Sequence, residues 1–124
     1  MAESERWQKG AAKMKELFGS EPRPGMMHED FLKITVENLF GDVWGRPGLE
    51  TRERSLITVA ALTVLARERE LKVHLRGALN VGISREKINE IMMHLAHYGG
   101  WPVGVNGLRI AKELFDEIDA KAKG

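Results

Sequence analysis

Residues 68–101 read ERELKVHLRGALNVGISREKINEIMMHLAHYGGW, and they are the clearest guide to the fold class of this chain. Their apolar residues recur three and four positions apart on both sides of Gly82, which is the spacing of one face of an α-helix. Ser84 is a good N-cap for a helix that follows the turn, and Gly99 with Gly100 can end that helix. The segment therefore predicts a helix, a turn and a second helix.

The remaining residues also follow helical patterns, so we expect an all-α fold of about six helices. The segment SEPRPGMM at 20–27 contains prolines and a glycine and predicts a loop. The segment WGRPGL at 44–49 predicts a second break, because Pro47 cannot continue a helix. The expected helices cover residues 4–19, 29–43, 51–66, 68–80, 84–99 and 102 onward, with a fraying tail at 120–124.

The third of these helices, capped by Thr51, has an almost wholly apolar part that reads LITVAALTVLA from Leu56 to Ala66. Its β-branched residues would also suit a strand. The run is long for a strand and shows no alternation of apolar and polar residues, so we favour a helix. A helix that is apolar all round is expected to be buried on most sides.

Three other helices have an apolar face. On the second helix this face consists of Phe31, Ile34, Val36, Leu39, Phe40 and Val43; on the fifth, of Ile88, Ile91, Met92, Leu95 and Tyr98; on the last, of Val105, Leu108, Ala111, Leu114, Phe115 and Ile118. Ile110 falls outside the last face, and we expect it to meet another subunit. Because the second and third helices offer more apolar surface than a chain of this size readily buries, we expect an oligomer.

The composition is typical of a single domain without thiol chemistry. The chain has 124 residues, 43% of them hydrophobic, and we expect one domain over residues 1–124. A formal net charge of +1 argues against nucleic acid as a partner, and the absence of cysteine excludes disulfides and thiolate metal sites. The first residues lack the apolar core of a secretory signal, and no apolar run approaches the roughly 20 residues that span a bilayer. We therefore expect a cytoplasmic protein that does not contact membranes.

Acid–base side chains are concentrated in the same segment, 68–101. Glu70 stands four residues before His74, and Glu90 stands four residues before His94, so each pair lies on one helix face. Tyr98 extends the second pair by one turn. Each pair can also be an ordinary surface contact. We expect Glu90, His94 and His97 to be structural, with a place for His94 in the lining of a shared pocket as the alternative. The spacing differs from the Glu-x-x-His motif of di-iron bundles, so no metal is expected.

Four segments together resemble the carboxymuconolactone decarboxylase family. They are WGRPGL at 44–49, TRERSL at 51–56, ELKVHLRGALNVGIS at 70–84 and INEIMMHLAHYGGWP at 88–102. The resemblance implies an alkylhydroperoxidase-like subunit of six helices, assembled as a homotrimer or homohexamer. It also implies a lyase that removes CO₂ from γ-carboxymuconolactone without a cofactor, giving the β-ketoadipate enol-lactone in aromatic catabolism.

A second branch of this superfamily reduces peroxides with a Cys-x-x-Cys motif followed four residues later by histidine. If that histidine is placed on His74, the cysteine positions fall on Arg67 and Glu70. The upstream glutamate that relays protons in that branch falls on Ser55. All the redox positions are replaced, so thiol-dependent peroxide reduction is excluded.

The chemistry that the resemblance implies makes His74 and Glu70 the candidate catalytic residues. Loss of CO₂ from the lactone places negative charge on its conjugated carbonyl, so the substrate supplies the electron sink and no cofactor is expected. An acid must then protonate the ring carbon. His74 is the candidate acid or oxyanion donor, and Glu70 can orient its ring.

The candidate substrate-binding residues are Arg46, Trp44, His94 and Tyr98. The guanidinium of Arg46 matches a carboxylate, although it can instead brace a helix end. Trp44 can form a wall of the pocket, and His94 and Tyr98 can line a shared one. The alternative is a non-catalytic helical oligomer that serves in assembly or in binding small molecules, because one fold supports many functions.

Overall fold

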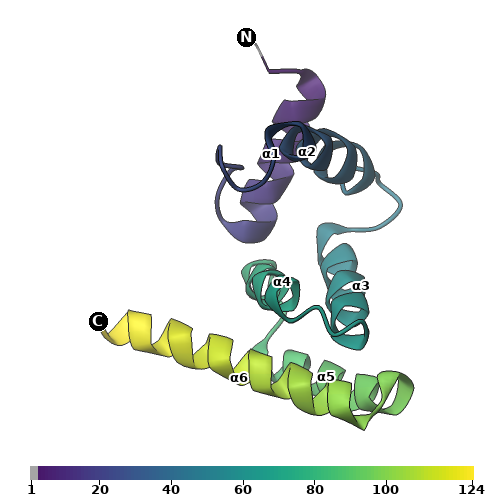
Figure 1. The fold of residues 1–124 in the computed structure, drawn as a ribbon, viewed down its shortest axis with the longest axis vertical. Helices are drawn as coiled ribbons and strands as arrows, with labels where there is room; N and C mark the ends of the chain where they lie inside the picture. Colours follow the sequence, from purple (N-terminus) through teal and green to yellow (C-terminus); the bar gives the residue numbers. More distant parts are fainter. Residues whose placement is uncertain (1–2) are drawn as a thin grey trace. The chain divides into compact units, whose positions relative to one another are not determined.

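A computed structural model describes residues 3–124, and every regular element in that range is helical (Figure 1). The predicted all-α class is therefore confirmed. The chain divides into two compact units, one ending at Arg54 and the other beginning at Ser55. Each unit is described here by itself. That residues 1–124 form a single domain stays a prediction.

The first unit begins with α1 (Glu5–Phe18), whose ends match the sequence signals. The hydroxyl of Ser4 accepts a hydrogen bond from the backbone N–H of Trp7 (3.0 Å), which satisfies one of the unpaired donors at the helix start. Gly19 ends the helix with φ of 86°, a left-handed conformation in which glycine is at no steric disadvantage. The predicted loop follows this glycine.

The second predicted helix is present but changes its winding. Residues Glu29–Ile34 form the α-helix α2, and residues Thr35–Val43 form the π-helix η1. The backbone N–H of Trp44 bonds the carbonyl of Leu39, five residues back, as π-winding requires. Every fourth residue along this helix points inward. These buried residues are Leu32, Val36, Phe40 and Trp44.

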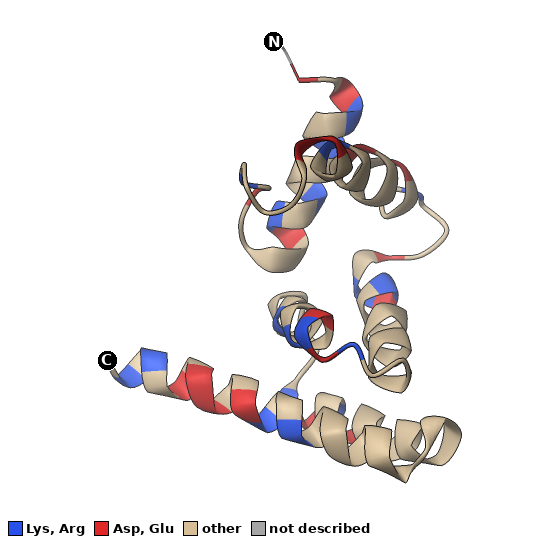
Figure 2. Ribbon diagram, viewed as in Figure 1, with Lys and Arg blue, Asp and Glu red and all other residues tan. Residues whose placement is uncertain are grey.

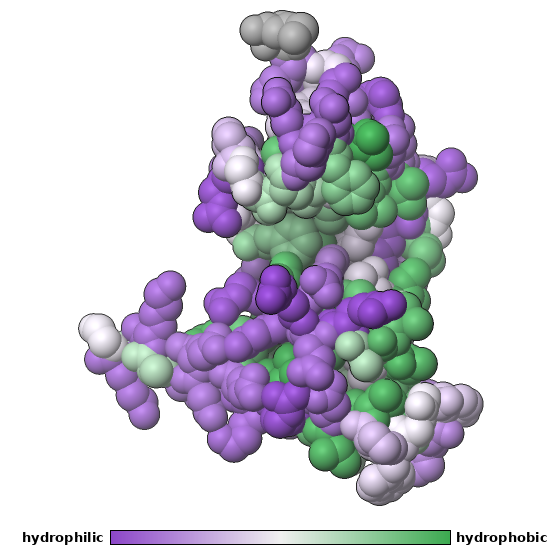
Figure 3. Space-filling model, in the orientation of Figure 1, coloured by the Kyte–Doolittle hydropathy of each residue, from purple (hydrophilic) through white to green (hydrophobic). Residues whose placement is uncertain are grey.

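The predicted apolar face of this helix is correct for only two of its six residues as a result. Val36 and Phe40 are buried, but Phe31 and Ile34 are 59% and 51% exposed. Leu39 and Val43 are 43% and 45% exposed, because the buried row spaced by four leaves them on another side. Apolar residues reach the surface in several places in Figure 3, which agrees with these exposures.

Close backbone contact joins α1 to η1. A methyl group added at Gly10 would lie 1.9 Å from the carbonyl oxygen of Val36, and one added at Gly41 would lie 2.6 Å from the carbonyl oxygen of Arg6. Both positions therefore require glycine, because any Cβ atom would force the helices apart.

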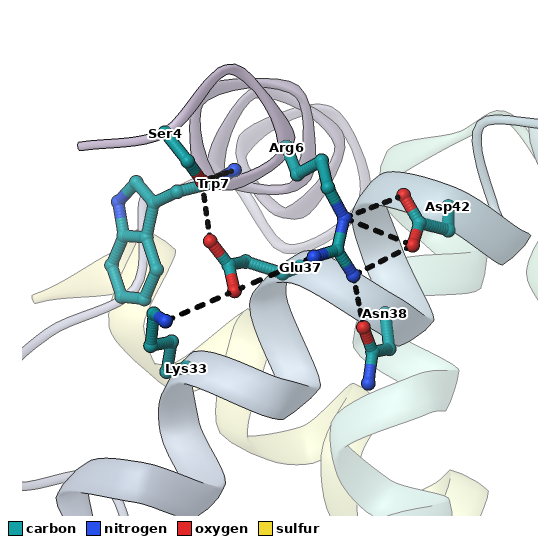
Figure 4. A network of polar contacts seen from close by, with 7 residues as sticks. All are labelled: Ser4, Arg6, Trp7, Lys33, Glu37, Asn38 and Asp42. Carbon is teal, nitrogen blue, oxygen red and sulfur yellow. Dashed lines mark hydrogen bonds and ion pairs between the residues drawn. The ribbon is translucent and has the colours of Figure 1, made fainter.

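A polar network fixes the start of α1 on η1 (Figure 4). Glu37 is only 6% exposed, and its carboxylate accepts a hydrogen bond from the Ser4 hydroxyl and faces Lys33 Nζ at 3.7 Å. Arg6 reaches from α1 toward Glu37 and pairs with Asp42 at 2.7 Å, which lowers the pKa of the Asp42 carboxyl. The nearly buried charge of Glu37 is thus surrounded by donors and cations, as burial of a carboxylate requires.

The helix α3 (Thr51–Val64) leads into the second unit, and the predicted helical conformation is confirmed. Thr51 is its first helical residue rather than its N-cap. The Thr51 hydroxyl accepts a hydrogen bond from Lys13 Nζ (2.7 Å). The helix start is closed instead by Glu53, whose carboxylate accepts from the backbone N–H of Glu50 (2.9 Å).

The prediction that α3 is buried on most sides is wrong for the single chain. Only one stripe of α3, with a spacing of four residues, is buried: Ser55, Val59 and Thr63. Ile57 is 57% exposed and Leu65 is 60% exposed, because the packing of this chain covers one side of the helix. Ala66 follows in a left-handed conformation with φ of 57°, which is unfavourable for a residue with a Cβ atom.

Helices α4 (Glu68–Asn80), α5 (Arg85–Gly99) and α6 (Trp101–Lys123) complete the second unit. The predicted ends of α4 and α5 are confirmed, with a hydrogen bond from Lys87 N–H to the hydroxyl of the Ser84 cap (3.1 Å). The core of this unit consists of Val59, Leu71, Leu75, Ala78, Ile83, Ile88, Met92, Ile110, Ala111 and Leu114. Helix α6 packs on both α4 and α5.

Three predictions about buried faces in this unit are wrong. Ile110 is 2% exposed and belongs to the core of its own subunit, whereas Val105 and Tyr98 are 57% and 78% exposed. The reason is the close crossing of α5 and α6, where a Cβ atom on Gly104 would lie 2.5 Å from the Cβ of Ala96. Glycines at this crossing turn the face that contains Gly104, Gly107 and Ile110 toward α5, and Val105 faces outward.

The predicted fraying of residues 120–124 is also wrong, since α6 continues to Lys123. Acidic residues follow one another along its C-terminal half, and basic residues lie on both sides of them (Figure 2). Ion pairs four residues apart join Arg109 to Glu113 (2.8 Å) and Lys112 to Asp116 (2.7 Å), and such pairs favour the helical state. Among residues 3–124, no helix combines the length and the apolar character that are needed to cross a membrane.

Candidate functional site

The helix α4 presents Glu70 and His74 on a side that differs from its buried face. Leu71 and Leu75 are buried in the core at 1% and 0% exposure. Ion pairs also connect α4 to α6, including Glu68 to Arg109 at 2.8 Å. This packing fixes the rotation of α4 about its axis and leaves His74 half-buried and Glu70 exposed.

The environment of His74 favours its neutral form. Burial lowers the pKa of His74 below its ordinary value of 6.5, and the negative charge of Glu70 opposes this shift without cancelling it. The Glu70 carboxylate is thus close enough to act on the imidazole through space, and the orientation of the ring by Glu70 stays a prediction. At neutral pH the imidazole of His74 is mostly uncharged, and it can donate one hydrogen bond and accept another.

Trp44 and Arg46 lie in the first unit. Trp44 is 6% exposed, and its ring packs 5.5 Å from that of Phe40, so it contributes to the core there. Arg46 is exposed in the loop after η1, and its backbone carbonyl accepts a hydrogen bond from Arg54 Nη2 (3.1 Å). Arg54 thus holds the loop at Arg46, a connection that the spacing of the two arginines in sequence does not reveal.

His94 and Tyr98 line the same pocket on α5, and their role as substrate ligands stays a prediction. The pocket is a shallow and open depression, and its lining residues, all exposed and all on α5, are Glu90, Met93, His94, His97 and Tyr98. The rings of His94 and Tyr98 lie 5.0 Å apart at an angle of 32°. Neither Glu70 nor His74 lines this pocket, so the structure does not place the six candidate residues in one site.

His97, expected to be structural, also lines this pocket. Its Nδ1–H donates to the carbonyl of Met93 (2.9 Å), and its ring meets the edge of Trp101 at 5.4 Å. The position of His97, three residues after His94 and four before Trp101, was a signal available in the sequence. In the part of the chain that the structure describes, no group of three or more histidine and acidic side chains is arranged to hold a metal ion.

The fold and these residues define a class: small all-α proteins with a carboxylate–imidazole pair on a helix that packs against the core. The family model of the carboxymuconolactone decarboxylase family matches residues 29–113. This chain belongs to that family.

Three relatives give the range of similarity. Over 91 residues the chain is 36% identical to a 4-carboxymuconolactone decarboxylase of Acinetobacter baylyi, covering 73% of this chain and 68% of that protein. Over 101 residues it is 31% identical to a nitrosuccinic acid decarboxylase of Metarhizium robertsii, covering 82% and 66%. Over 86 residues it is 33% identical to an uncharacterised 15.0 kDa protein of Paracoccus denitrificans, covering 68% and 64%. The chain thus spans about two thirds of the length of each relative.

Proposed function

We propose that this protein is a decarboxylase of a small dicarboxylate that carries its own electron-withdrawing group. The names of two relatives support this class of substrate. In carboxymuconolactone the electron pair released with CO₂ can move onto the conjugated lactone carbonyl, and in nitrosuccinic acid it can move onto the nitro group. Both compounds also retain a second carboxylate. The shared chemistry needs no organic cofactor, because the substrate takes up the electrons.

Within this class we propose γ-carboxymuconolactone, or a similar carboxylated lactone, as the substrate. The bond between the ring carbon and its carboxylate breaks, CO₂ leaves, and a dienolate forms. A proton then adds to the carbon next to the lactone carbonyl and gives the enol-lactone of β-ketoadipate. A protein that catalyses this reaction has to stabilise the dienolate oxygen and to deliver the proton.

The observation that carries this proposal is the half-buried position of His74 one turn after Glu70. In the protein without substrate the imidazole of His74 is neutral. During the reaction its N–H can donate a hydrogen bond to the oxyanion that develops on the substrate. A bound dianion adds its negative charge to that of Glu70, and both favour protonation of the ring. The imidazolium can then give its proton to the dienolate carbon and return to the neutral form.

The other candidate residues keep supporting roles in this proposal. Arg46, in the exposed loop after η1, is proposed as a carboxylate ligand. Trp44 stays a predicted wall residue, and His94 and Tyr98 stay predicted substrate ligands.

We also propose self-association into a homotrimer or homohexamer. Exposed apolar side chains support it in both units, including Phe31 at 59% and Ile57 at 57%. Light scattering at micromolar concentration should report a particle several times the 14.0 kDa of the chain. A compact monomer at that concentration would contradict this expectation. The cytoplasmic location stays a prediction from the sequence.

Incubation of the purified protein with γ-carboxymuconolactone, with nitrosuccinate as a parallel substrate, tests the proposal directly. We expect release of CO₂ that survives dialysis against a chelator. In D₂O the product should carry one deuterium on the protonated carbon. Failure to accelerate CO₂ release from either compound, in a preparation with full helical signal, would refute the decarboxylase proposal.

A further inference from the structure

Apolar side chains gather in the second unit where α3 and α5 end and α6 begins. A Cβ atom at Gly99 would lie 2.9 Å from a methyl carbon of Val64 and 3.0 Å from one of Val103, so these helix ends are in close contact. We call the surface that they share the apolar end. Its residues, all at least 40% exposed, are Val64, Leu65, Met93, Tyr98, Trp101 and Val105.

The composition of the apolar end is typical of a protein interface. The sequence from Ile91 to Leu108 contains no lysine, arginine, aspartate or glutamate, and Figure 2 shows the end of α5 and the start of α6 without charged residues. The centres of protein interfaces are depleted of charge and enriched in tyrosine, tryptophan and methionine. Helices that lie on membranes instead combine apolar residues with lysine and arginine. The apolar end therefore fits a protein better than a lipid surface.

The size and the charge of the apolar end fit a second copy of the same chain. Tyr98 and Trp101 are 78% and 65% exposed, and together they leave roughly 200–350 Å² to water, since a covered aromatic side chain buries about 150–250 Å². The other four residues extend this area toward the roughly 800 Å² that each partner contributes to a standard interface. Two copies can meet through the same surface, because uncharged surfaces do not repel each other.

The depression on α5 borders the apolar end and is open to solvent. Its lining residues include the proposed substrate ligands His94 and Tyr98, and all of them are exposed and belong to one helix. Tyr98 is part of both surfaces, and the ring of His97 in the depression lies 5.4 Å from the ring of Trp101 in the apolar end. Sites for small molecules enclose most of the ligand, so one helix face is not sufficient to form such a site.

We propose that a second copy of this chain packs on the apolar end and supplies the missing wall of the depression on α5. The site that contains His94 and Tyr98 then lies between two subunits and is incomplete in one chain. The inference rests on the proposed function for the role of these two residues as substrate ligands. The second copy covers Trp101 and Val105, while His94 and Tyr98 face the enclosed space.

Single cysteines test whether the apolar end is covered, because the chain has no cysteine of its own. Val105→Cys introduces a thiol in the apolar end, and Val73→Cys introduces a matched one on α4. The two valines are 57% and 50% exposed, so a single chain should be labelled at similar rates. In the native protein at micromolar concentration, a maleimide should label the Val105→Cys thiol at least about tenfold more slowly, because a covered thiol reacts only when the interface opens. Each rate is divided by the rate of the same variant in denaturant.

Met93→Cys tests whether the second copy forms a wall of the depression, which Met93 lines. A depression enclosed by two subunits admits a small reagent and excludes a bulky one. We compare methyl methanethiosulfonate with a polyethylene glycol maleimide. The ratio of the two rates, small reagent over bulky reagent, should be several times higher for Met93→Cys than for Val73→Cys.

Val105→Lys places a charge in the apolar end at a position that is more than half exposed, so the fold of one chain should tolerate it. Sedimentation velocity should report a smaller particle than that of the unmodified protein. The size selectivity of the Met93→Cys thiol should disappear in this background. Val73→Lys is the matched control and should keep the particle mass.

Equal normalised labelling of Val105→Cys and Val73→Cys would overturn the inference, and so would an unchanged particle mass of Val105→Lys. A Met93→Cys thiol without size selectivity in the assembled protein would exclude a wall formed by the second copy. None of these measurements depends on turnover. Protection of the Val105→Cys and Met93→Cys thiols in a protein that releases no CO₂ would therefore refute the proposed function and leave the inference intact.

Discussion

Replacing Gly10 by alanine tests the close packing of α1 on η1. The new methyl group would lie 1.9 Å from the carbonyl oxygen of Val36, whereas ordinary contacts begin at 3.4 Å. The helices must therefore separate by about 1.5 Å, the difference between 3.4 and 1.9 Å. A gap of about 0.5–1 Å already removes a quarter to a half of each van der Waals contact energy.

The expected destabilisation follows from opposing contributions. Overpacking costs about 1–3 kcal/mol, and the upper end applies because the obstacle is backbone that cannot rotate away. Alanine regains up to about 1 kcal/mol of helix propensity over glycine. The net loss in the free energy of unfolding should therefore be about 2 kcal/mol.

Urea unfolding followed by tryptophan fluorescence measures this loss. In a Trp101→Phe background the fluorescence comes from Trp7 and Trp44, both in the first unit. With a urea m-value of about 2 kcal/mol/M, the midpoint should fall by about 1 M. Gly48→Ala is the matched control, because a Cβ atom at Gly48 has open space around it. A Gly10→Ala midpoint equal to that of the control would refute the close contact between α1 and η1.

Three further predictions concern His74 and the turn before α4. His74→Gln should lower kcat by about 10²–10⁴, the usual effect of losing a positioned acid or base. The control is His28→Asn, which removes an exposed imidazole, keeps a good N-cap and should have the normal rate. Normal turnover by a correctly assembled His74→Gln variant would exclude His74 as the acid. Folding lowers the pKa of His74, so just below pH 6.5 the unfolded chain binds more protons than the folded chain. This residue should therefore make the free energy of unfolding fall as the pH drops through that range. Above that range it should not change the free energy of unfolding with pH. Urea midpoints measured from pH 5 to 8 check this. If the midpoint of His74→Gln changes with pH as much as that of the unmodified protein, other groups cause the pH dependence. Ala66→Gly should raise the free energy of unfolding by about 0.5–1 kcal/mol, because glycine relieves the left-handed strain at φ of 57°, and a fall in thermal midpoint would contradict that.

Local signals in the sequence predicted most helix ends correctly. Ser4, Gly19 and Ser84 act through their own side chain or φ angle on neighbouring backbone atoms, so a few adjacent residues are sufficient to recognise them. The position of Glu70 one turn before His74 is equally local. Their electrostatic interaction was therefore predictable, although the size of the burial at His74 was not.

The buried faces were less predictable, because several apolar stripes on one helix compete for the core. The glycines of α6 allow close approach to α5, and this contact buries Ile110 and exposes Val105. The π-winding of η1 is another such case, since a row of apolar residues spaced by four fits both helix types. Partners distant in sequence, such as Ser4 and Glu37, meet only after these helices pack.

The sequence by itself determined the all-α class, the caps at Ser4 and Ser84, the family and the spacing of Glu70 and His74, because each depends on residues close together in the chain. Tertiary structure decided which stripe of each helix is buried and how far His74 is removed from water. These features depend on packing between helices. Glycines such as Gly10 and Gly104 allow two helices to approach closely, and this contact decides which face is buried more than the average hydrophobicity of the face does.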